Sequence, residues 1–540
     1  MVYDKFLDNL KKDYVWQRGR GRDNYSPDEA QRYATNDLLC DIQMGLNEKG
    51  KLNLEFHIPE ADFTMRHKID LNAGEKGPQA KQYFDDHINT LNENQKTVLE
   101  TIKKAFDDNN GGFYFIDASG GTGKTYLINI LLSYVRMKDK IAIATATSGI
   151  AGTLLRKGTT AHNRFKFPIP IFVDSTCNIK LTSTEAEVIT NAELIVLDEA
   201  SMLHQNNLSA LDRFLQELMV NKTIFGGKLV IICGDFRQIL PIIPRGRRAD
   251  IVKASLKRSS LWKHCTTLKL TENMRVQRMI DKNPTQTNIE YLQQYSEWLL
   301  SIGEGTTPTV RDNIIELDRE IVCETVNEVI DEIYNDFESN SSNPEYFKDR
   351  AILASTNAIV DTINEQMLDK LQSPTQTFPS LDTVMDPDHA PVFPTEFLNK
   401  IEYSGTLQHN LKLKPNAVIM LVRNLDVKRE HCNGTRYMII SINRHLIVAK
   451  RLNRQNNDVI LIPRIPFYTK DTQFPFIMKR LQFPVKLAYA MTFNRSQGQS
   501  LTKCGVILLG NVWTHGQLYV AFSRCGDKRN LKIYANQDEF

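Results

Sequence analysis

A glycine-rich segment, Asp117-Ala-Ser-Gly-Gly-Thr-Gly-Lys-Thr125, follows a strand-like run at residues 112–116 and precedes a helix-like run at Tyr126–Val135. Its glycines let backbone N–H groups converge on phosphate oxygens, and the helix N-terminus adds its dipole. Ala118 stands where the strict pattern has glycine, which is a minor departure. We therefore predict a site for ATP in which Lys124 reaches the β- and γ-phosphates and the Thr125 hydroxyl holds Mg²⁺. The predicted phosphate-binding residues are Gly120, Gly121, Thr122, Gly123, Lys124 and Thr125.

A pair of acids follows another apolar run, in Leu194-Ile-Val-Leu-Asp-Glu-Ala-Ser201. Two adjacent acids after four apolar residues are costly unless a cation or substrate compensates them. At the end of a strand beside the phosphate loop, Asp198 is expected to hold Mg²⁺ through water. Glu199 is expected to polarise the attacking water.

Three further residues suit phosphoryl transfer. Gln238, in Cys233-Gly-Asp-Phe-Arg-Gln-Ile-Leu-Pro241, is predicted to sense the γ-phosphate. Arg275, in Leu270-Thr-Glu-Asn-Met-Arg275, and Arg524, in Gln517-Leu-Tyr-Val-Ala-Phe-Ser-Arg524, suit stabilisation of transition-state charge. An isolated arginine is more often a surface residue, so the surrounding motifs carry this assignment.

Strand-like and helix-like runs alternate from Leu91 onward, which is typical of a mostly parallel sheet with crossover connections. The first series of predicted strands is Gly112–Asp117, Ile141–Thr147, Leu194–Leu197, Lys228–Cys233 and Thr267–Leu270. The second series is Ala351–Ala354, Val506–Leu509 and Leu531–Tyr534. The sequence therefore predicts two α/β lobes.

A run of short β-branched segments interrupts the second series and predicts a small inserted β-barrel. Its expected strands are Val418–Val422, Tyr437–Ile442, Leu446–Lys450 and Val459–Ile462. Ser339–Asn343 and the proline-rich Ser373–Pro394 are expected to be loops. In the N-terminal region, Tyr33, Leu38, Leu39, Ile42 and Leu46 suggest one amphipathic helix. No chemistry is recognisable there, and residues 1–90 are interpreted as an appendage.

Composition excludes several classes of protein. Apolar residues make up 41% and charged residues 24% of the 540 positions, an ordinary globular balance. No window approaches the ~18 uninterrupted apolar residues of a membrane span. The N-terminal residues carry early acids and no apolar core, which argues against a secretory signal or transit peptide. The eight cysteines have no metal-ligand spacing, so free thiols in a reducing, intracellular compartment are expected.

From Leu91 to the C-terminus, the motifs together resemble the PIF (petite integration frequency) helicases of superfamily one, and their sequences are most similar to the helicase part of Helitron transposon proteins and related eukaryotic or viral copies. Besides the phosphate loop and the catalytic motifs, the matching segments are Leu91–Gln95, Ala144–Ala151, Thr159–His162, Phe225–Lys228, Ile352–Asn357, Leu411–Asn424, Asn433–Arg436, Tyr489–Ser500 and Leu518–Arg524. Arg495 and Asn416 depart from the family's usual lysine and glycine.

The resemblance implies an α/β protein with two RecA-like P-loop lobes. It places the first lobe at 91–278, with a small insert at about 153–190, and the second at 279–540, with an SH3-like β-barrel at about 403–487. It implies an ATP-dependent, Mg²⁺-requiring DNA helicase, monomeric as a motor, moving 5′→3′ on single-stranded DNA and unwinding forked or tailed duplexes. In a eukaryote the nucleus is the expected location. The alternative is the helicase portion of a larger transposon Rep-helicase protein.

The resemblance also implies roles for individual residues. Gln95 would read the adenine, and the residues expected to contact DNA or couple it to ATP are Thr147, His162, Phe165, Asn357, Arg495 and Gln497. His162 could equally be structural. The Phe165–Pro168 segment and Phe172 could form a strand-separating pin, or they could pack the insert onto its lobe, which is favoured for Phe172.

Basic runs at Arg245–Arg248 and Lys253–Arg258, and Lys479, Arg480 and Lys486, are more often solvated faces than strand contacts. Two other functions would place their own requirements on the sequence. A nucleotide-dependent switch would need a broken Gln238, Gln497 or Arg524, and all three are intact. A nuclease with an attached motor would need a carboxylate cluster outside the motor, and none is visible.

Overall fold

A computed structural model describes residues 35, 36, 39 and 77–535, except 244–245, 283, 312–313, 387–391, 402–406, 427–428, 453–458, 470–473 and 510–514. Of the predicted N-terminal amphipathic helix, all defining residues but Leu39 lie outside this range, as does Cys40. The seven other cysteines are free thiols. Within the described residues, no helix combines the length and the apolar composition that crossing a membrane requires.

The first unit is built on a six-stranded parallel sheet in the order β3-β2-β4-β5-β1-β6. Its strands are β1 (Gly112–Ala118), β2 (Ile141–Ala146), β3 (Thr159–Thr160), β4 (Ala192–Asp198), β5 (Leu229–Gly234) and β6 (Thr266–Leu270). The predicted first series of strands is thereby confirmed. Strands β2 and β5 are buried along their whole length, and β4 at all but one residue, because helices cover both faces of the sheet.

Helices of the first unit connect these strands. They are α3 (Gly77–Ile88), α4 (Glu93–Asp107), α5 (Lys124–Arg136), α6 (Gly149–Leu154), α7 (Ala161–Phe165), α8 (Thr184–Asn191), α9 (Gln205–Leu218) and α10 (Arg248–Ala254). Short 3₁₀ turns lie at η2 (Ala200–Met202), η3 (Ile224–Gly227), η4 (Leu256–Arg258) and η5 (Ser260–His264). Along β1, Phe113 and Phe115 pack in one core with α9, whereas Ile116 and Ala118 pack in the other core with α5.

The N-terminal limit of this unit differs from the predicted one at Leu91. Helix α3 packs against α5, and Phe84 is buried with its ring 5.4 Å from that of Tyr134. The region before Leu91 lacks recognisable motifs, but its Ala80 and Phe84 recur at helical spacing and are buried. Residues 77–88 are therefore part of the first core and not an appendage.

The second unit carries a four-stranded parallel sheet in the order β20-β9-β21-β22. The strands are β9 (Arg350–Ala354), β20 (Ala490–Thr492), β21 (Lys503–Leu508) and β22 (Leu531–Ala535), so the second predicted series is also confirmed. Its helices are α12 (Gln286–Glu304), α13 (Val326–Ile333), α14 (Phe337–Asn340), α15 (Pro344–Lys348), α16 (Asn357–Asp369), α18 (Phe493–Ser496) and α19 (Gln517–Ser523), and α11 (Met274–Lys282) connects the two units. Two parallel α/β units agree with the predicted pair of RecA-like lobes, and below we call them the first and second lobes.

A β-rich insertion separates β9 from β20. Its five-stranded antiparallel sheet contains β13 (Val418–Leu421), β14 (Arg436–Ile442), β15 (Leu446–Arg451), β16 (Val459–Pro463) and β19 (Val485–Leu487). Smaller antiparallel sheets pair β10 (Gln376–Pro379) with β12 (Asn410–Leu413), and β11 (Leu381–Val384) with β18 (Met478–Gln482) and β17 (Ile465–Tyr468). Helix α17 (Thr395–Lys400) packs on β11.

Two predicted loops are wrong in part. Residues 373–394 contain β10 and β11, and because these strands pair with β12 and β18 the insertion begins before residue 403. Proline misled the prediction, since Pro379 is compatible with β10, an edge strand of a two-stranded sheet. Residues 339–343 include the last turn of α14.

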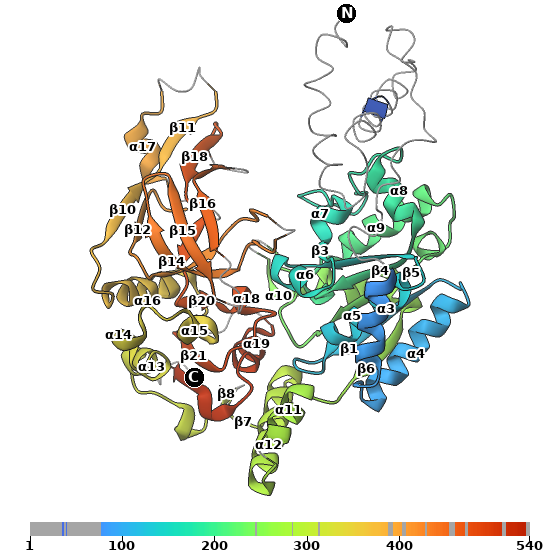
Figure 1. The fold of residues 1–540 in the computed structure, drawn as a ribbon, viewed down its shortest axis with the longest axis horizontal. Helices are drawn as coiled ribbons and strands as arrows, with labels where there is room; N and C mark the ends of the chain where they lie inside the picture. The colour runs from blue at the N-terminus through green and yellow to red at the C-terminus, as the bar shows by residue number, and fades with distance from the viewer. Residues whose placement is uncertain are drawn as a thin grey trace, which may run out of the picture.

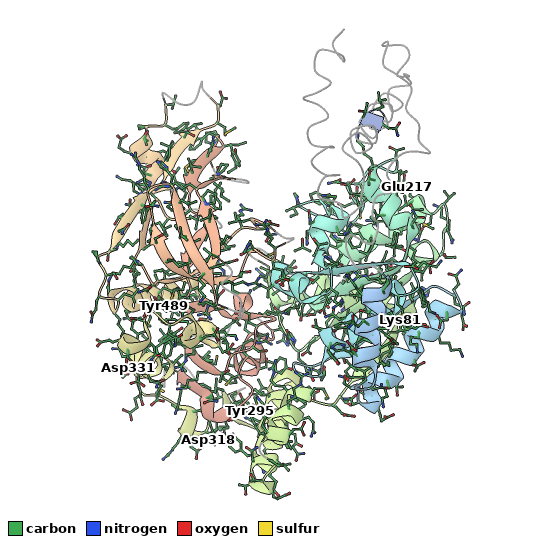
Figure 2. The ribbon with its side chains drawn as sticks, viewed as in Figure 1. Lys81, Glu217, Tyr295, Asp318, Asp331 and Tyr489 are labelled. Carbon is green, nitrogen blue, oxygen red and sulfur yellow. The ribbon has the colours of Figure 1, made fainter. Side chains whose placement is uncertain are left out.

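The two lobes lie side by side, with α11 and α12 between them at the lower edge and the insertion above the second sheet (Figure 1). Tyr489, labelled in Figure 2, links the second sheet to the insertion. Its hydroxyl accepts the Val418 N–H at 3.2 Å, and its carbonyl accepts the Tyr334 hydroxyl at 2.6 Å. Helix α12 packs on α19, where the rings of Trp298 and Phe522 stack at 5.5 Å.

Candidate active site

The phosphate loop ends β1 and begins α5, as predicted. Gly121 and Gly123 have left-handed φ values of 94° and 79°. A Cβ at Gly121 would lie 2.5 Å from the Asn273 Oδ1, and one at Gly123 would lie 2.5 Å from the Gln95 Nε2. The loop therefore needs glycine at both positions, and its curve turns backbone N–H groups toward a common point.

Gln95 holds this loop from α4. Its side-chain Nε2 donates to the Thr122 carbonyl at 3.0 Å, and its Oε1 accepts the Asn92 N–H at 3.3 Å. The Asn92 side chain in turn accepts the Gln95 N–H at 2.7 Å, which completes a capping box at the start of α4. Gln95, predicted to read a base, thus also fixes the loop to the helix cap.

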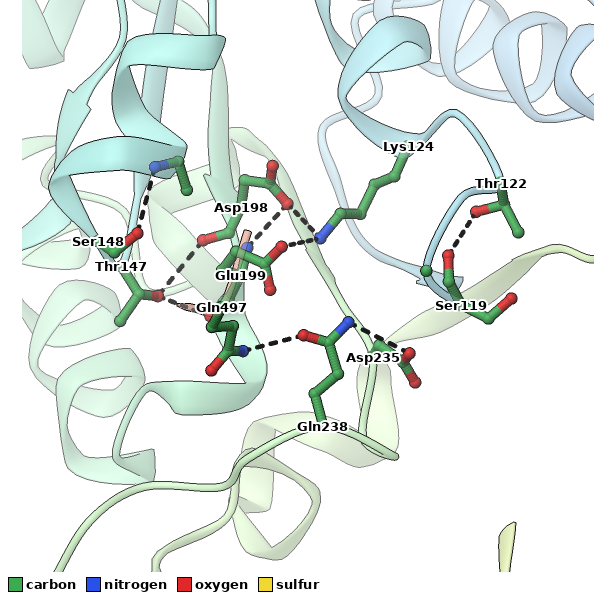
Figure 3. Close-up of polar contacts among 12 residues, drawn as sticks. Ser119, Thr122, Lys124, Thr147, Ser148, Asp198, Glu199, Asp235, Gln238 and Gln497 are labelled. Atoms are coloured by element: carbon green, nitrogen blue, oxygen red, sulfur yellow. Dashed lines mark hydrogen bonds and ion pairs between the residues drawn. The ribbon is translucent and has the colours of Figure 1, made fainter. Parts of the chain in front are cut away.

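Lys124 lies between the two acids of the second motif (Figure 3). Its Nζ is 2.8 Å from the Asp198 Oδ1 and 2.9 Å from the Glu199 Oε1. Burial disfavours the charged amine, but the two carboxylates outweigh this and raise the pKa of Lys124. A buried lysine on two buried acids is a cation held ready for anionic phosphate oxygens.

The two acids differ in their electrostatic surroundings. Burial raises the pKa of Asp198, against the influence of Lys124. Burial would also raise the pKa of Glu199, but Lys124, Arg524 and Gln497 together lower it. Glu199 is therefore held as a carboxylate, the form that accepts a proton from water.

Thr147 is bound to this acid pair. Its hydroxyl donates to the Glu199 carbonyl at 2.7 Å, and its N–H donates to the Asp198 carbonyl at 3.1 Å. Thr147, predicted to contact DNA or couple it to ATP, thus bonds the backbone carbonyls of both acids.

Gln238 and Gln497 connect the lobes beside the acids. The Gln497 Nε2 donates to the Gln238 Oε1 at 3.1 Å, and the Gln238 Nε2 donates to the Asp235 Oδ2 at 3.4 Å (Figure 3). Both glutamines are buried, at 6% and 4% exposure. Because Gln497 belongs to the second lobe, the predicted coupling residue does meet the predicted γ-phosphate sensor.

The two predicted arginines lie at the same interface. The Arg275 guanidinium donates to the Ser523 carbonyl at 3.1 Å and to the Ser500 hydroxyl at 2.7 Å. The Arg524 guanidinium donates to the Val520 and Gln499 carbonyls, both at 3.1 Å. Among the described residues neither forms an ion pair with a carboxylate, and burial lowers the pKa of both. Arg524 is buried and Arg275 is half-buried, and two such arginines without an ion-pair partner favour an anion between them.

The site fits a nucleoside triphosphate on its own geometry. Beyond the loop, the Glu199 Oε2 and the Gln497 Oε1 are buried without a hydrogen-bond partner. Such atoms are costly unless a ligand or water satisfies them. Hydroxyl and carboxylate oxygens are the ligands that Mg²⁺ prefers, so Thr125 and Asp198 are suited to it.

Sequence reasoning missed Tyr519 of α19. Its hydroxyl accepts the Gly120 N–H at 3.4 Å, which joins the second lobe to the phosphate loop. Arg237 was also missed: it bonds Asp235 at 2.8 Å and, across the lobes, Glu304 at 3.2 Å. Both residues lie within recognised motifs. Their contacts with Gly120 and Glu304 join segments that are far apart in the sequence, and only the fold reveals them.

Asn357, Arg495 and His162, all predicted to lie on the DNA side, keep some exposed surface. Asn357 is exposed at the start of α16, and Arg495 is half-buried in α18 with its pKa lowered by burial. His162 is half-buried, with its ring edge-on to Phe167 at 5.5 Å, and burial lowers its pKa.

Phe165 is fully buried, so its prediction as a DNA contact is wrong. It packs with Phe167 in the core under α9, because α7, which ends at Phe165, turns this ring inward. Phe172, expected to pack, is instead 60% exposed, beside Ile169 at 83% and Val173 at 77%. Burial thus reverses the expected roles in this insert.

Comparison with known proteins finds similarity to DNA helicases. Residues 90–313 match the family model described as PIF1-like helicase, and residues 396–442 match that of the 2B domain of DNA helicase Pif1. The chain is 27% identical to the ATP-dependent DNA helicase PIF1 of Xenopus laevis, over 82% of this chain and 61% of that protein. It is 26% identical to the ATP-dependent DNA helicase Pif1 of Campylobacter jejuni, over 78% of this chain and 89% of that protein.

Two solved structures share the fold. Bacteroides Pif1 bound to ssDNA superposes with a TM-score of 0.60 at 22% identity, over 82% of this chain and 92% of that chain. Candida albicans Pif1 superposes with a TM-score of 0.55 at 22% identity, over 82% of this chain and 94% of that chain. These likenesses support the two-lobed architecture.

Proposed function

We propose that this chain, which matches the PIF1-like helicase model over residues 90–313 and the Pif1 2B-domain model over residues 396–442, is an ATP-dependent DNA helicase that translocates on single-stranded DNA. The observation that carries the proposal is the approach of Arg524 and Gln497 from the second lobe to Glu199 in the first. Because charge between the lobes changes when a nucleotide binds or is hydrolysed, the lobes would close and open once per cycle. Such a cycle is what moves a two-lobed motor along a strand.

Each residue of the site has a role in this proposal. Lys124 exchanges its two carboxylates for phosphate oxygens, and Thr125 and Asp198 hold Mg²⁺, which neutralises phosphate charge when bound. Glu199 accepts the proton of the attacking water, and Gln238 senses the γ-phosphate. Arg275 and Arg524 donate to the oxygens on which charge develops.

Contact with DNA is assigned to both lobes. Exposed Asn357 and half-buried Arg495 are placed on the strand in the second lobe, and His162 in the first. Thr147 acts by coupling, since its hydroxyl is bonded to Glu199. The exposed Ile169, Phe172 and Val173 replace Phe165 as the apolar residues available to bases.

The family supports a 5′→3′ direction and forked or tailed duplexes as substrates. One solved relative is described as two coordinating Pif1 helicases unwinding forked dsDNA. For this chain we propose a monomeric motor, with a nuclear location in a eukaryotic cell. From the motifs we also propose closeness to Helitron proteins, and with it a role as the helicase part of a larger transposon Rep-helicase protein.

We place the division between the lobes near residue 278, since α12 packs on α19 of the second lobe. The first lobe then begins at α3 and carries its small insert at about 153–190. Strands β12 to β19 form the SH3-like barrel of the second lobe in this proposal, supported by the antiparallel order β16-β15-β14-β13-β19.

The test is an unwinding assay with two duplexes that differ only in the polarity of a single-stranded tail. We expect strand separation of the 5′-tailed duplex, dependent on ATP and Mg²⁺, and none of the 3′-tailed duplex. A Lys124→Ala variant is the control for contaminating helicases. Equal separation of both duplexes would contradict the direction, and failure with both would contradict helicase activity.

A further inference from the structure

A basic surface segment follows the Gln238 motif. Residues 247–264, from α10 through η5, contain six lysines and arginines and a single acid, in a chain whose net charge is only +3. All six cations are exposed, and none forms an ion pair within the described part of the chain: Arg247, Arg248, Lys253, Lys257, Arg258 and Lys263. Asp250, the single acid, accepts the Arg247 N–H at 2.8 Å and caps α10. The positive charge of this segment is therefore not neutralised.

A pocket of about 390 Å³ opens beside this segment. Its apolar wall is formed by Phe236, Leu240 and Val252, and its polar wall includes Lys257 and Arg258. The Lys257 Nζ lies 4.4 Å from the centre of the Phe236 ring. Apolar and aromatic surface next to cations suits an unstacked base with its phosphate. A basic run alone is commonly a solvated face, and the pocket is the second observation that points to a ligand.

The second lobe closes one side of the pocket. His515 lines it, and its Nε2 lies 2.8 Å from the Phe236 carbonyl. Phe236 is two residues before Gln238, the γ-phosphate sensor. The pocket is therefore separate from the nucleotide site but next to the same lobe interface.

Helix α9 connects the segment to the exposed apolar loop of the insert. At its start, the Gln205 side chain donates to the Lys253 carbonyl at 2.7 Å. About 12 Å farther along the helix axis, Arg213 donates to the Ser175 carbonyl at 3.1 Å. Ser175 closes the loop that exposes Phe172, whose N–H donates to the Ser175 hydroxyl. Both surfaces thus lie on the α9 side of the first lobe.

We propose that residues 247–258 and this pocket form a second single-stranded DNA site, which holds the strand displaced at a fork. Arg248, Lys253 and Arg258 bind successive phosphates, and the pocket receives an unstacked base over Val252 and Phe236. A duplex does not meet this description, because its bases are stacked and paired. The inference rests on the proposed helicase function, but it concerns the strand that the motor does not track.

The experiment compares two substrates that share a 5′ tail: a duplex with that tail alone, and a fork that also carries a 3′ tail. The test variant is Lys253→Gln/Arg258→Gln. Its matched control is Lys81→Gln/Lys104→Gln, two exposed lysines on α3 and α4; Figure 2 labels Lys81. The affinity for each substrate is measured as a function of salt concentration. The ATPase rate is measured on a single-stranded oligonucleotide that is too short to extend beyond the path of the tracked strand.

We expect wild type and control to bind the fork more tightly than the single-tailed duplex. The test variant should lose about tenfold in fork affinity and leave single-tailed binding unchanged. Its salt slope on the fork should fall by about 1.4, since each lost single-strand phosphate contact contributes about 0.7. Val252→Gln should also lose the fork preference, because it places a polar amide in the apolar wall of the pocket. It should keep the salt slope, because no charge is removed.

Three outcomes would overturn the proposal. The first is a test variant that keeps the fork preference, and the second is equal weakening of both substrates, which would place these cations on the tracked strand. The third is competition by ADP for the 3′ tail in a Lys124→Ala background, which would make the pocket a mononucleotide site. If wild type shows no ATPase response to the short oligonucleotide, the proposed helicase function has failed instead.

Discussion

The side-chain amide of Gln497 donates to that of Gln238 at 3.1 Å, across the interface between the two lobes. Gln238 continues the connection to Asp235, and Gln497 lowers the pKa of Glu199. Gln497 follows Arg495 in the motif that we place beside DNA. One buried amide thus connects the motif that we place beside DNA to the residue that we propose activates water.

Gln497→Ala and Arg524→Ala should therefore have different effects on hydrolysis. The first should leave ATP affinity nearly intact and weaken the stimulation by DNA, because the connection between DNA and Glu199 is cut. The second should lower basal and stimulated rates alike, by about 100-fold or more, since it removes a donor to the transition state. ATPase rates with and without single-stranded DNA measure both effects.

Gln499→Ala is a suitable control, since it removes the same side chain two residues away from Gln497. Within the described part of the chain its amide bonds only the Arg495 carbonyl, at 3.2 Å, and the Gln499 carbonyl that Arg524 uses is unchanged. If Gln497→Ala loses basal and stimulated activity in the same proportion, the coupling role is wrong.

Lys124→Ala should abolish ATP hydrolysis, because the phosphates lose their cation and two buried acids are left without one. Glu199→Gln preserves shape but cannot accept a proton, so it should bind ATP normally and turn over about 10²–10⁴-fold more slowly. Nucleotide binding by fluorescence and turnover by phosphate release separate these effects. Turnover within a few-fold of wild type in either variant would contradict the assignment.

Much of this site was predictable because its determinants are local. The loop at Gly120–Thr125 and the acids at Asp198 and Glu199 each end a strand, and strand, turn and helix follow one another in the sequence. Contacts between distant segments were not predictable. Tyr519 meets Gly120 only because α19 packs at the interface, and Phe165 is buried because α7 turns it under α9. Neither orientation follows from residue type.

The N-terminal boundary gives a third prediction. A chain that begins at Gly77 should keep DNA-stimulated ATPase, since it retains α3. A chain that begins at Leu91 should be less stable, because it loses Ala80 and Phe84 from the core on α5. Removal of one buried Phe costs about 3–5 kcal/mol, so the shorter chain should unfold at lower temperature. Equal melting temperatures for the two chains would restore the original boundary at Leu91.

Lys228 gives a prediction that depends on pH. It is 8% exposed, and its Nζ donates to the Thr190 carbonyl at 2.9 Å and the Ala192 carbonyl at 2.8 Å, near the end of α8. Burial lowers the pKa of Lys228 to about 8, with Glu193 opposing the change. The ammonium is thus held by backbone oxygens, while the carboxylate of Glu193 pairs with Lys140.

In the unfolded chain the pKa of a lysine is about 10.4, so between pH 8 and about 10.4 the unfolded state binds more protons than the folded state. The free energy of unfolding should therefore rise with pH in this window, by at most about 3 kcal/mol from Lys228. Below pH 8 both states are protonated, and the folded state bears the full cost of the buried charge.

Urea unfolding at pH 7.5 and pH 10, in reducing buffer, should show wild type gaining stability relative to Lys228→Met as pH rises. Lys222→Met, which removes an exposed lysine nearby, should show no such trend. A stability difference between wild type and Lys228→Met that is the same at both pH values would mean that Lys228 does not titrate in this window.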